Sequence, residues 1–236
     1  MSQKQPTPPV PDLARAKGET VPELVEWFVD YHEEGGCPWN YRNGTKITKA
    51  SYKGLHRLDL LLAGCEKEKT KQGRKSNREL VELAAPLAFG RSTQVFDLPA
   101  RRFHFGRDRN AAYRIPFFFV ENGIIKVYFL QPRKNNGPNI DELGMIATIQ
   151  KRYLLDTEFY GNPVDVEFVS LGSSMEGGPR VLGSYSLEKL KLWSDKRLAD
   201  RLTAISEALD IIDNEGLVSE RRRIWRRPEP EMPIFD

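Results

Sequence analysis

The dipeptide Asn122-Gly123 stands between two runs of apolar, β-branched and aromatic residues, at positions 113–120 and 124–131. Asn-Gly is the pair that a two-residue hairpin turn prefers, because both turn residues need a positive φ. We therefore predict a β-hairpin in which Glu121 pairs with Ile124. The first of its strands contains three consecutive phenylalanines, which predicts a strand that is covered on both faces.

Apolar residues recur at helical spacing in three segments ahead of this hairpin. We predict helices there, at residues 20–34, 48–64 and 77–88. Thr20 is a suitable N-cap for the first helix, and Ser76 or Asn77 is suitable for the third. The charged segment 66–78 is predicted to be a solvated loop.

Past Gly90 the pattern changes to short β-type runs. Besides the hairpin strands, we predict strands at residues 93–98, 101–105 and 164–171. Asn139 is a suitable N-cap for a helix over residues 140–155, which would cross over between two parallel strands. A helical hairpin or a single long helix is predicted over residues 187–212. From residue 77 onward the elements then follow the order α-β-β-β-α-β.

These elements predict an α/β (α+β) fold. Its parts are a helical N-terminal section at 20–90, a central mixed sheet at 93–171 and C-terminal helices at 186–214. We expect one domain at residues 20–217, since 39% hydrophobic and 29% charged residues are ordinary for a globular protein. Residues 1–19 contain four prolines and are predicted to form a disordered tail. Residues 218–236 are basic and contain proline, and we expect a second tail there.

Charge and cysteine content argue against several classes of protein. Thirty-six Lys and Arg against thirty-three Asp and Glu give a net charge of +3, which is too small to indicate nucleic-acid binding by itself. The two cysteines form no CxxC pair and no histidine has metal-ligand spacing, so we expect no metal site and no disulfide framework. The chain lacks eighteen consecutive apolar residues, so we expect no membrane partner and a cytoplasmic protein.

The α-β-β-β-α-β order over residues 77–171 resembles the core of the PD-(D/E)xK, or restriction-endonuclease-like, superfamily. The resemblance is one of topology and covers less than half of the chain. It implies a site in which an acid early in the second strand and an acid-x-Lys at the end of the third hold a divalent ion, often with a helix glutamate. In such a site carboxylates bind Mg²⁺, the ion activates water, and the lysine assists the nucleophile.

The sequence departs from that pattern at the motif positions. Continued pairing of the hairpin places Arg114 opposite Gln131, where the second-strand acid would stand. Gln131-Pro132-Arg133 then replaces the acid-x-Lys, so that an amide and a guanidinium stand where a carboxylate and an ammonium are expected. Such a site would repel a cation, and we expect a degenerate, inactive core. Relocated ligands stay open as an alternative, with the catalytic candidates Glu79, Glu82, Asp108, Gln131 and Lys134 and with Mg²⁺ as the cofactor.

The predicted strands also bring basic residues to one end of the sheet. We call this set the arginine cluster: Arg101, Arg102, Arg107, Arg109, Arg114, Arg133 and Lys134. Arginine suits bidentate contact with phosphate, so the cluster is our candidate nucleic-acid-binding site. The simpler interpretation is a group of surface arginines paired with Asp108 and Glu121.

The C-terminal segment extends this idea with an RRRIWRR run. Its candidate nucleic-acid contacts are Arg222, Arg223 and Trp225, because arginine beside tryptophan is a common recognition pair. The simpler interpretation is a solvated extension with the tryptophan packed on the body of the protein.

The last residues look like the short peptide by which bacterial replication and repair proteins dock on the sliding clamp. The residues that match it by type are Met232, Ile234 and Phe235, while Glu231 replaces the glutamine of that motif. An apolar peptide at a chain end suits insertion into a partner's groove. The alternative is a tail folded back onto its own domain.

Three functions are consistent with these features. The first is a nucleic-acid-associated protein with an inactive nuclease-like core, which binds DNA or a DNA-bound partner through the arginine cluster. The second is an active Mg²⁺-dependent endonuclease, which metal-dependent cleavage would identify. The third is an adaptor that works through protein contacts alone, for which deletion of residues 221–236 would abolish partner binding.

Overall fold

The structure is a computed structural model that describes residues 4–34, 40–135, 137–173 and 178–218. A five-stranded sheet with the strand order β1-β4-β5-β6-β7 lies at its centre. The strands are β1 Gln94–Phe96, β4 Phe117–Glu121, β5 Ile124–Gln131, β6 Val164–Ser170 and β7 Gly183–Tyr185. Strands β5 and β6 are parallel and the other neighbours are antiparallel. The predicted mixed α/β fold is confirmed.

The central hairpin β4–β5 has the predicted register, with Glu121 paired to Ile124. Phe117 and Phe119 are fully buried on one face of β4. Phe118 points to the opposite face, where it is partly buried against a second core cluster. The strand is therefore covered on both sides, as its three phenylalanines predicted.

The pairing of β4 with β5 does not extend as far as we predicted. It stops at Phe117, because Pro116 has no N–H to donate to a ladder and Arg114 turns the chain with a φ of +62°. Arg114 is therefore not paired with Gln131, and the predicted pairing is wrong at this end of the hairpin.

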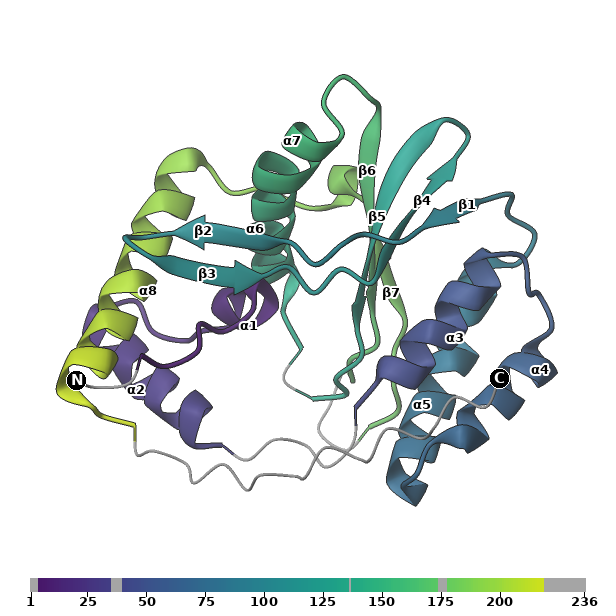
Figure 1. Ribbon diagram of the computed structural model, residues 1–236, viewed down its shortest axis with the longest axis horizontal. Coiled ribbons are helices and arrows are strands. Elements are labelled where there is room, and N and C mark those ends of the chain that lie inside the picture. The colour runs from purple at the N-terminus through teal and green to yellow at the C-terminus, as the bar shows by residue number, and fades with distance from the viewer. Residues whose placement is uncertain (1–3, 35–39, 136, 174–177, 219–236) are drawn as a thin grey trace, which may run out of the picture.

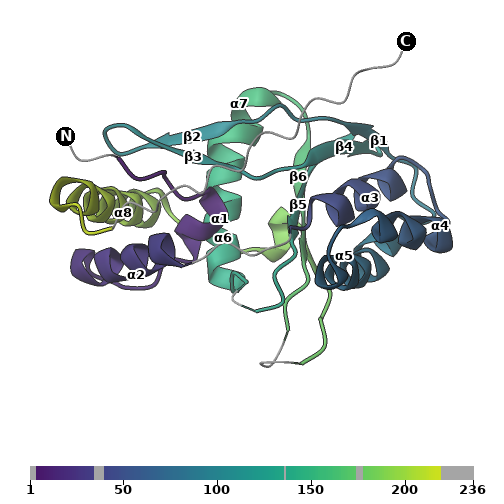
Figure 2. The same ribbon diagram turned by 60° about the horizontal axis from the view of Figure 1, so that its bottom comes forward.

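Helices cover both faces of the sheet (Figures 1 and 2). The face that carries Phe117, Tyr128 and Val169 packs against three helices in the same core cluster. These are α3 Arg42–Tyr52, α4 Leu58–Ala63 and α5 Lys71–Ala84, with the short η1 Gly64–Lys67 and η2 Ala85–Ala88 at the ends of α4 and α5.

The other face of the sheet carries Val127 and Phe168 and packs against α6 Ile140–Gln150, the crossover helix between β5 and β6. Its C-terminal extension comprises η3 Lys151–Leu155 and α7 Asp156–Glu158. Three further helices join this layer: α1 Val10–Ala14, α2 Val21–Glu33 and α8 Asp195–Glu215, the last preceded by η4 Leu187–Lys189. Helix α8 starts later than the predicted residue 187, at the N-cap Ser194.

A two-stranded ribbon is inserted between β1 and β4. It consists of β2 Arg102–Phe105 and β3 Arg109–Ala112, and it lies across α6 and α8 (Figure 1). The predicted strand at 101–105 therefore exists, but it belongs to this ribbon and not to the central sheet.

The N-terminal segment is part of the fold, contrary to the predicted tail. Val10 and Leu13 of α1 are fully buried. Pro9 is the N-cap of α1 and Pro11 lies in its first turn, where a missing N–H costs no helical hydrogen bond. The prolines therefore start a helix here, and the prediction of disorder is wrong for residues 4–19.

The helices of the region 40–84 also differ from the prediction. Gly54, with a φ of +101°, separates α3 from α4, so the predicted helix 48–64 is two helices. The expected loop at 66–78 is helical from Lys71, and Thr70 caps it by accepting a bond from Gly73 N at 3.0 Å. Asn77, an expected N-cap, is instead fully buried in the middle of α5.

Two predicted helix starts are confirmed. Glu23 accepts a bond from the N–H of Thr20 at 2.9 Å, and Asn139 accepts bonds from the first turn of α6. The predicted stop of the first helix at residues 35–36 lies outside the described residues. No helix in the described part of the chain is long and apolar enough to cross a membrane.

Candidate nucleic-acid interface

The ribbon β2–β3 stands apart from the central sheet and has a tight turn at residues 106–108. Gly106 in this turn has a φ of +59°. A Cβ at this position would lie 2.1 Å from the Oγ of Ser206 on α8, far inside van der Waals contact. Glycine is therefore the residue that lets the turn lie against α8 in this conformation.

Side chains alternate between the two faces of the ribbon. The inner face is buried in the core cluster that includes α6 and α8 and carries Phe103, Phe105 and Ala111. The outer face is exposed and carries Arg102, His104 and Asn110. An isolated two-stranded ribbon is marginally stable in water, so the inner face fixes the ribbon on the body and leaves the outer face open for contact.

Arg109 of β3 belongs to the inner face and is 1% exposed. Its Nη2 lies 2.5 Å from Oδ1 of Asp210 and 2.8 Å from Oδ2 of Asp213, both on α8. Two carboxylates around one guanidinium offset much of the cost of burying its charge. Arg109 thus anchors the ribbon to α8. The prediction that it contacts nucleic acid is wrong, because strand alternation turns its side chain inward, and Phe105 is its partner in the ribbon.

The other members of the arginine cluster have different surroundings. Arg101 pairs with Glu158 at 2.7 Å, and Arg133 pairs with Asp12 at 2.8 Å. The exposed members that form no ion pair with any described residue are Arg102, Arg107 and Arg114. The candidates of the C-terminal segment lie outside the described residues: Arg222, Arg223, Trp225, Met232, Ile234 and Phe235.

A groove of about 380 Å³ runs along the outer face of the ribbon, beside residues 4–7. Arg102 and Asn110 line it from the ribbon, and Lys4 lines it from the N-terminal segment. The Nζ of Lys4 lies 2.5 Å from Oδ2 of Asp108, and this bond lowers the pKa of the Asp108 carboxyl. Lys4 is therefore occupied by Asp108. The guanidinium of Arg102 forms no ion pair with a described residue and is available to an incoming anion.

The five catalytic candidates do not gather at one centre. Glu82 pairs with Arg78 on α5, whereas Asp108 lies at the ribbon turn, at the opposite end of the molecule (Figure 1). Gln131 ends β5, and Lys134 follows three residues later. Among the described residues, no three His, Cys, Asp or Glu side chains are grouped so that they could hold a metal ion.

The remaining candidate, Glu79 of α5, is paired with the buried Arg180. The Nε of Arg180 lies 3.1 Å from Oε2 of Glu79, and the arginine side chain is 5% exposed. Its Nη1 also donates to the carbonyl oxygens of Pro132 and Leu171, at 2.6 and 3.0 Å, where β5 and β6 end. A fixed guanidinium thus stands among the oxygens at this edge of the sheet. A lone arginine in a loop carries no sequence signal that would have indicated this.

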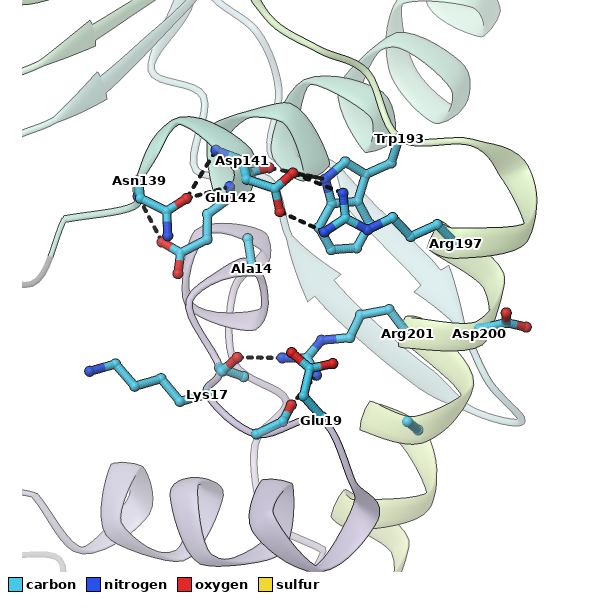
Figure 3. A pocket seen from close by; sticks show the side chains of 13 residues that line it. Ala14, Lys17, Glu19, Asn139, Asp141, Glu142, Trp193, Arg197, Asp200 and Arg201 are labelled. Atoms are coloured by element: carbon cyan, nitrogen blue, oxygen red, sulfur yellow. Dashed lines mark hydrogen bonds and ion pairs between the residues drawn. The ribbon is translucent and has the colours of Figure 1, made fainter.

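A larger pocket, of about 510 Å³, lies between residues 14–19, the start of α6 and α8 (Figure 3). Arg197 lies over the ring of Trp193, 3.7 Å from its centroid, and donates to both oxygens of Asp141 at 2.8 and 2.6 Å. Arg201 donates to two carbonyl oxygens of the segment 14–19. No sequence pattern indicated this pocket.

The charged groups of this pocket mainly hold its walls together. Glu142 accepts a bond from Asn139 N at 2.8 Å, and Arg201 ties α8 to the N-terminal segment. Burial raises the pKa of Glu142 and lowers the pKa of Arg201. Among the described residues that line the pocket there is no histidine or cysteine. The ribbon, with its unpaired arginines, is therefore the better candidate for a binding site.

The chain matches no protein-family model, no curated protein and no solved structure.

Proposed function

We propose that the protein binds nucleic acid through the outer face and the turn of the ribbon, and that its nuclease-like core is inactive. The observation that carries this proposal is the pair Arg102 and Arg107, two exposed guanidinium groups without an ion pair to any described residue, on a ribbon that Arg109 anchors to α8. Such groups suit contacts to phosphates and base edges. The major groove of DNA also admits a two-stranded ribbon.

The inactive core is supported by the surroundings of its motif positions. The elements α5, β1, β4, β5, α6 and β6 follow the α-β-β-β-α-β order with the ribbon inserted. Gln131 stands at the end of β5, and Arg133 after it is paired with Asp12. The helix carboxylate Glu79 is occupied by Arg180. Positive charge at these positions opposes the binding of a divalent cation.

The ligand of this proposal is DNA or a DNA-bound partner, and the place of action is the cytoplasm. Cys65 agrees with a reducing compartment as a free thiol, and it is fully buried, which raises its pKa to about 11. Such a thiol is unreactive and needs no disulfide partner.

The test is fluorescence anisotropy of labelled duplex and single-stranded DNA with the full chain, over a salt series. We expect Arg102→Gln/Arg107→Gln to bind at least about tenfold more weakly than wild type, with a shallower salt dependence. The matched control is Lys189→Gln/Lys191→Gln, which removes two exposed charges elsewhere and should bind as wild type does.

Equal affinities of the ribbon variant and the control would disprove the ribbon interface. Gels of the same samples with and without Mg²⁺ test the inactive core, since cleavage that requires Mg²⁺ and is lost in Glu79→Ala would establish an active endonuclease. If the protein binds neither duplex nor single-stranded DNA at low salt, both nucleic-acid functions fail, and the protein–protein adaptor is the function that stands.

A further inference from the structure

We propose that helix α3 carries a second phosphate-binding surface, which fits the backbone of a nucleic-acid duplex. This α3 stripe consists of Arg42, Lys46 and Lys49 of the helix and of Lys53, its C-cap. The class of ligand, nucleic acid, is taken from the proposed function. The residues of the stripe lie outside the ribbon. The inference also adds a preference for duplex over single strands.

Positive charge is concentrated in this part of the chain. Residues 40–78 contain eleven Lys and Arg but three Asp and Glu, although the net charge of the whole protein is +3. Residues 40–58 contain no acidic residue at all. Residues 40–78 therefore carry a net charge of +8, while the rest of the chain, with 25 Lys and Arg against 30 Asp and Glu, carries −5. Such a local field attracts polyanions.

The four cations share one side of α3. They recur at intervals of four, three and four residues, which is the repeat of a helix surface. The buried residues of α3 lie on the opposite side and are Gly44, Thr48, Ser51 and Tyr52. Over the eleven helical steps from Arg42 to Lys53 the stripe is roughly 16 Å long, comparable to the rise of about five phosphates along one DNA strand.

Most of the stripe is available for a ligand. Lys49 pairs with Asp97 and is 16% exposed. Arg42, Lys46 and Lys53 are exposed or half-exposed and form no ion pair with any residue that the structure describes. Exposed cations at this spacing suit a series of phosphates better than one small anion.

The cation at the start of α3 does not serve the stability of the helix, whereas Lys49 in its last turn does. Helices α2, α6 and α8 carry an acid in the first turn, as the helix dipole favours. Helices α3 and α5 carry none, and Arg42 lies at the first position of α3. A cation there costs about 0.3–1 kcal/mol. Contact with a ligand explains why an arginine stands at this position, and helix stability does not.

The stripe favours a duplex because the described residues of α3 offer no exposed ring for base stacking. Proteins that bind single strands combine a basic groove with exposed aromatic side chains. The aromatic residue of α3, Tyr52, is 1% exposed and packs against Phe117 and Phe119 of the sheet. A straight row of cations on a rigid helix instead matches the regular backbone of a double helix.

The experiment measures anisotropy of a labelled 20-base-pair duplex (about two turns) and of a single strand of equal length, over a salt series. The variant is Lys46→Glu/Lys53→Glu, and the control is Lys189→Glu/Lys191→Glu, which makes the same change in net charge elsewhere. We expect the stripe variant to lose about tenfold or more in duplex affinity, with the salt slope reduced by about 2, and to lose less for the single strand. Lys46→Gln/Lys53→Gln provides the same test if the charge reversal impairs folding.

A stripe variant that binds duplex as tightly as the control does would overturn the inference, and so would an equal loss for both nucleic acids. Loss of binding to phosphatidylserine vesicles without loss of duplex binding would also overturn it. The duplex affinities of the ribbon variant and the stripe variant distinguish the two proposals. If Arg102→Gln/Arg107→Gln binds normally and the stripe variant does not, the ribbon proposal fails and the stripe stands.

Discussion

Arg91 and Glu121 form a bidentate ion pair at the turn end of the central hairpin, with 2.7 Å between Nε and Oε1 and 2.8 Å between Nη2 and Oε2. On its other side Arg91 donates to both oxygens of Glu167 on β6, at 3.0 and 2.8 Å. Its guanidinium lies 5.3 Å from the ring centroid of Tyr52 on α3, whose hydroxyl donates to Glu167. One arginine thus links the basic helices to two strands of the sheet.

Removal of this arginine should strongly destabilise the protein. The side chains of Glu121 and Glu167 are 14% and 11% exposed, so Arg91→Ala would leave two poorly hydrated carboxylates without their main partner. We expect a loss of about 3–5 kcal/mol in the free energy of unfolding, measured by urea denaturation at pH 7.

The control for this prediction is Arg57→Ala. Arg57 pairs with Asp59, but both side chains are more than 60% exposed, so the change should leave the free energy of unfolding nearly unchanged. Equal effects of the two substitutions would show that the Arg91 network does not stabilise the fold.

The same network predicts a loss of stability in acid. The hydrogen bonds from Arg91 lower the pKa of Glu121 to about 2 in the folded protein, whereas an unfolded glutamate titrates near 4.3. Because the folded pKa is the lower one, the stabilisation is complete above the unfolded pKa and is lost as the pH falls towards about 2.

We therefore expect Glu121→Gln to cost on the order of 2–3 kcal/mol at pH 7 and progressively less between about pH 5 and pH 2. Urea midpoints of wild type and variant over this range test the prediction. A difference that stays constant with pH would contradict it, because it would come from a group that does not titrate.

The hairpin and the helix starts were predictable because their signals are local. Asn122-Gly123 determines the turn, and the turn determines the pairing of Glu121 with Ile124. Thr20 and Asn139 are each followed three residues later by a glutamate that completes a capping box. Such contacts lie within a few residues and can be inferred without knowledge of the rest of the chain.

The first half of α5, from Lys71 to Ser76, was predicted as a loop because its buried side is small and polar. Gly73, Ser76 and Asn77 are buried there, so no apolar periodicity indicated a helix. Asn77 accepts a bond from Gly44 N at 2.7 Å, a contact with a residue far away in the sequence. The candidate site was only partly predictable for the same reason. The arginines are visible in the sequence, but Arg109 is separated from Arg102 and Arg107 by its partners on α8.

The N-terminal helix α1 should contribute to stability although its sequence is rich in proline. Leu13 is 0% exposed in the core cluster shared with α6. We expect Leu13→Ala to cost about 2–5 kcal/mol, while Leu60→Ala, at a side chain on α4 that is 48% exposed, should cost less than about 1 kcal/mol. Thermal unfolding of both variants checks this. A mobile tail at residues 4–19 would give no effect of Leu13→Ala.

The turn of the ribbon allows a test that connects stability with binding. Gly106 and Gly90 have positive φ values of +59° and +75°, so alanine at either position introduces backbone strain that costs about 1–2 kcal/mol. A Cβ at Gly90 meets nothing within 4 Å, whereas one at Gly106 collides with Ser206 of α8. Gly106→Ala must therefore also displace the ribbon from α8.

We expect Gly106→Ala to lose at least about 1 kcal/mol more than Gly90→Ala in urea denaturation, because the added methyl group would overlap the Oγ and Cβ of the buried Ser206. Displacement of the ribbon would also disturb the ion pairs of Arg109 with α8 and the positions of Arg102 and Arg107. Duplex affinity should then fall in Gly106→Ala and stay at the wild-type value in Gly90→Ala. If the Gly106→Ala protein is folded and less stable but binds duplex with unchanged affinity, the packing of the ribbon against α8 does not matter for binding.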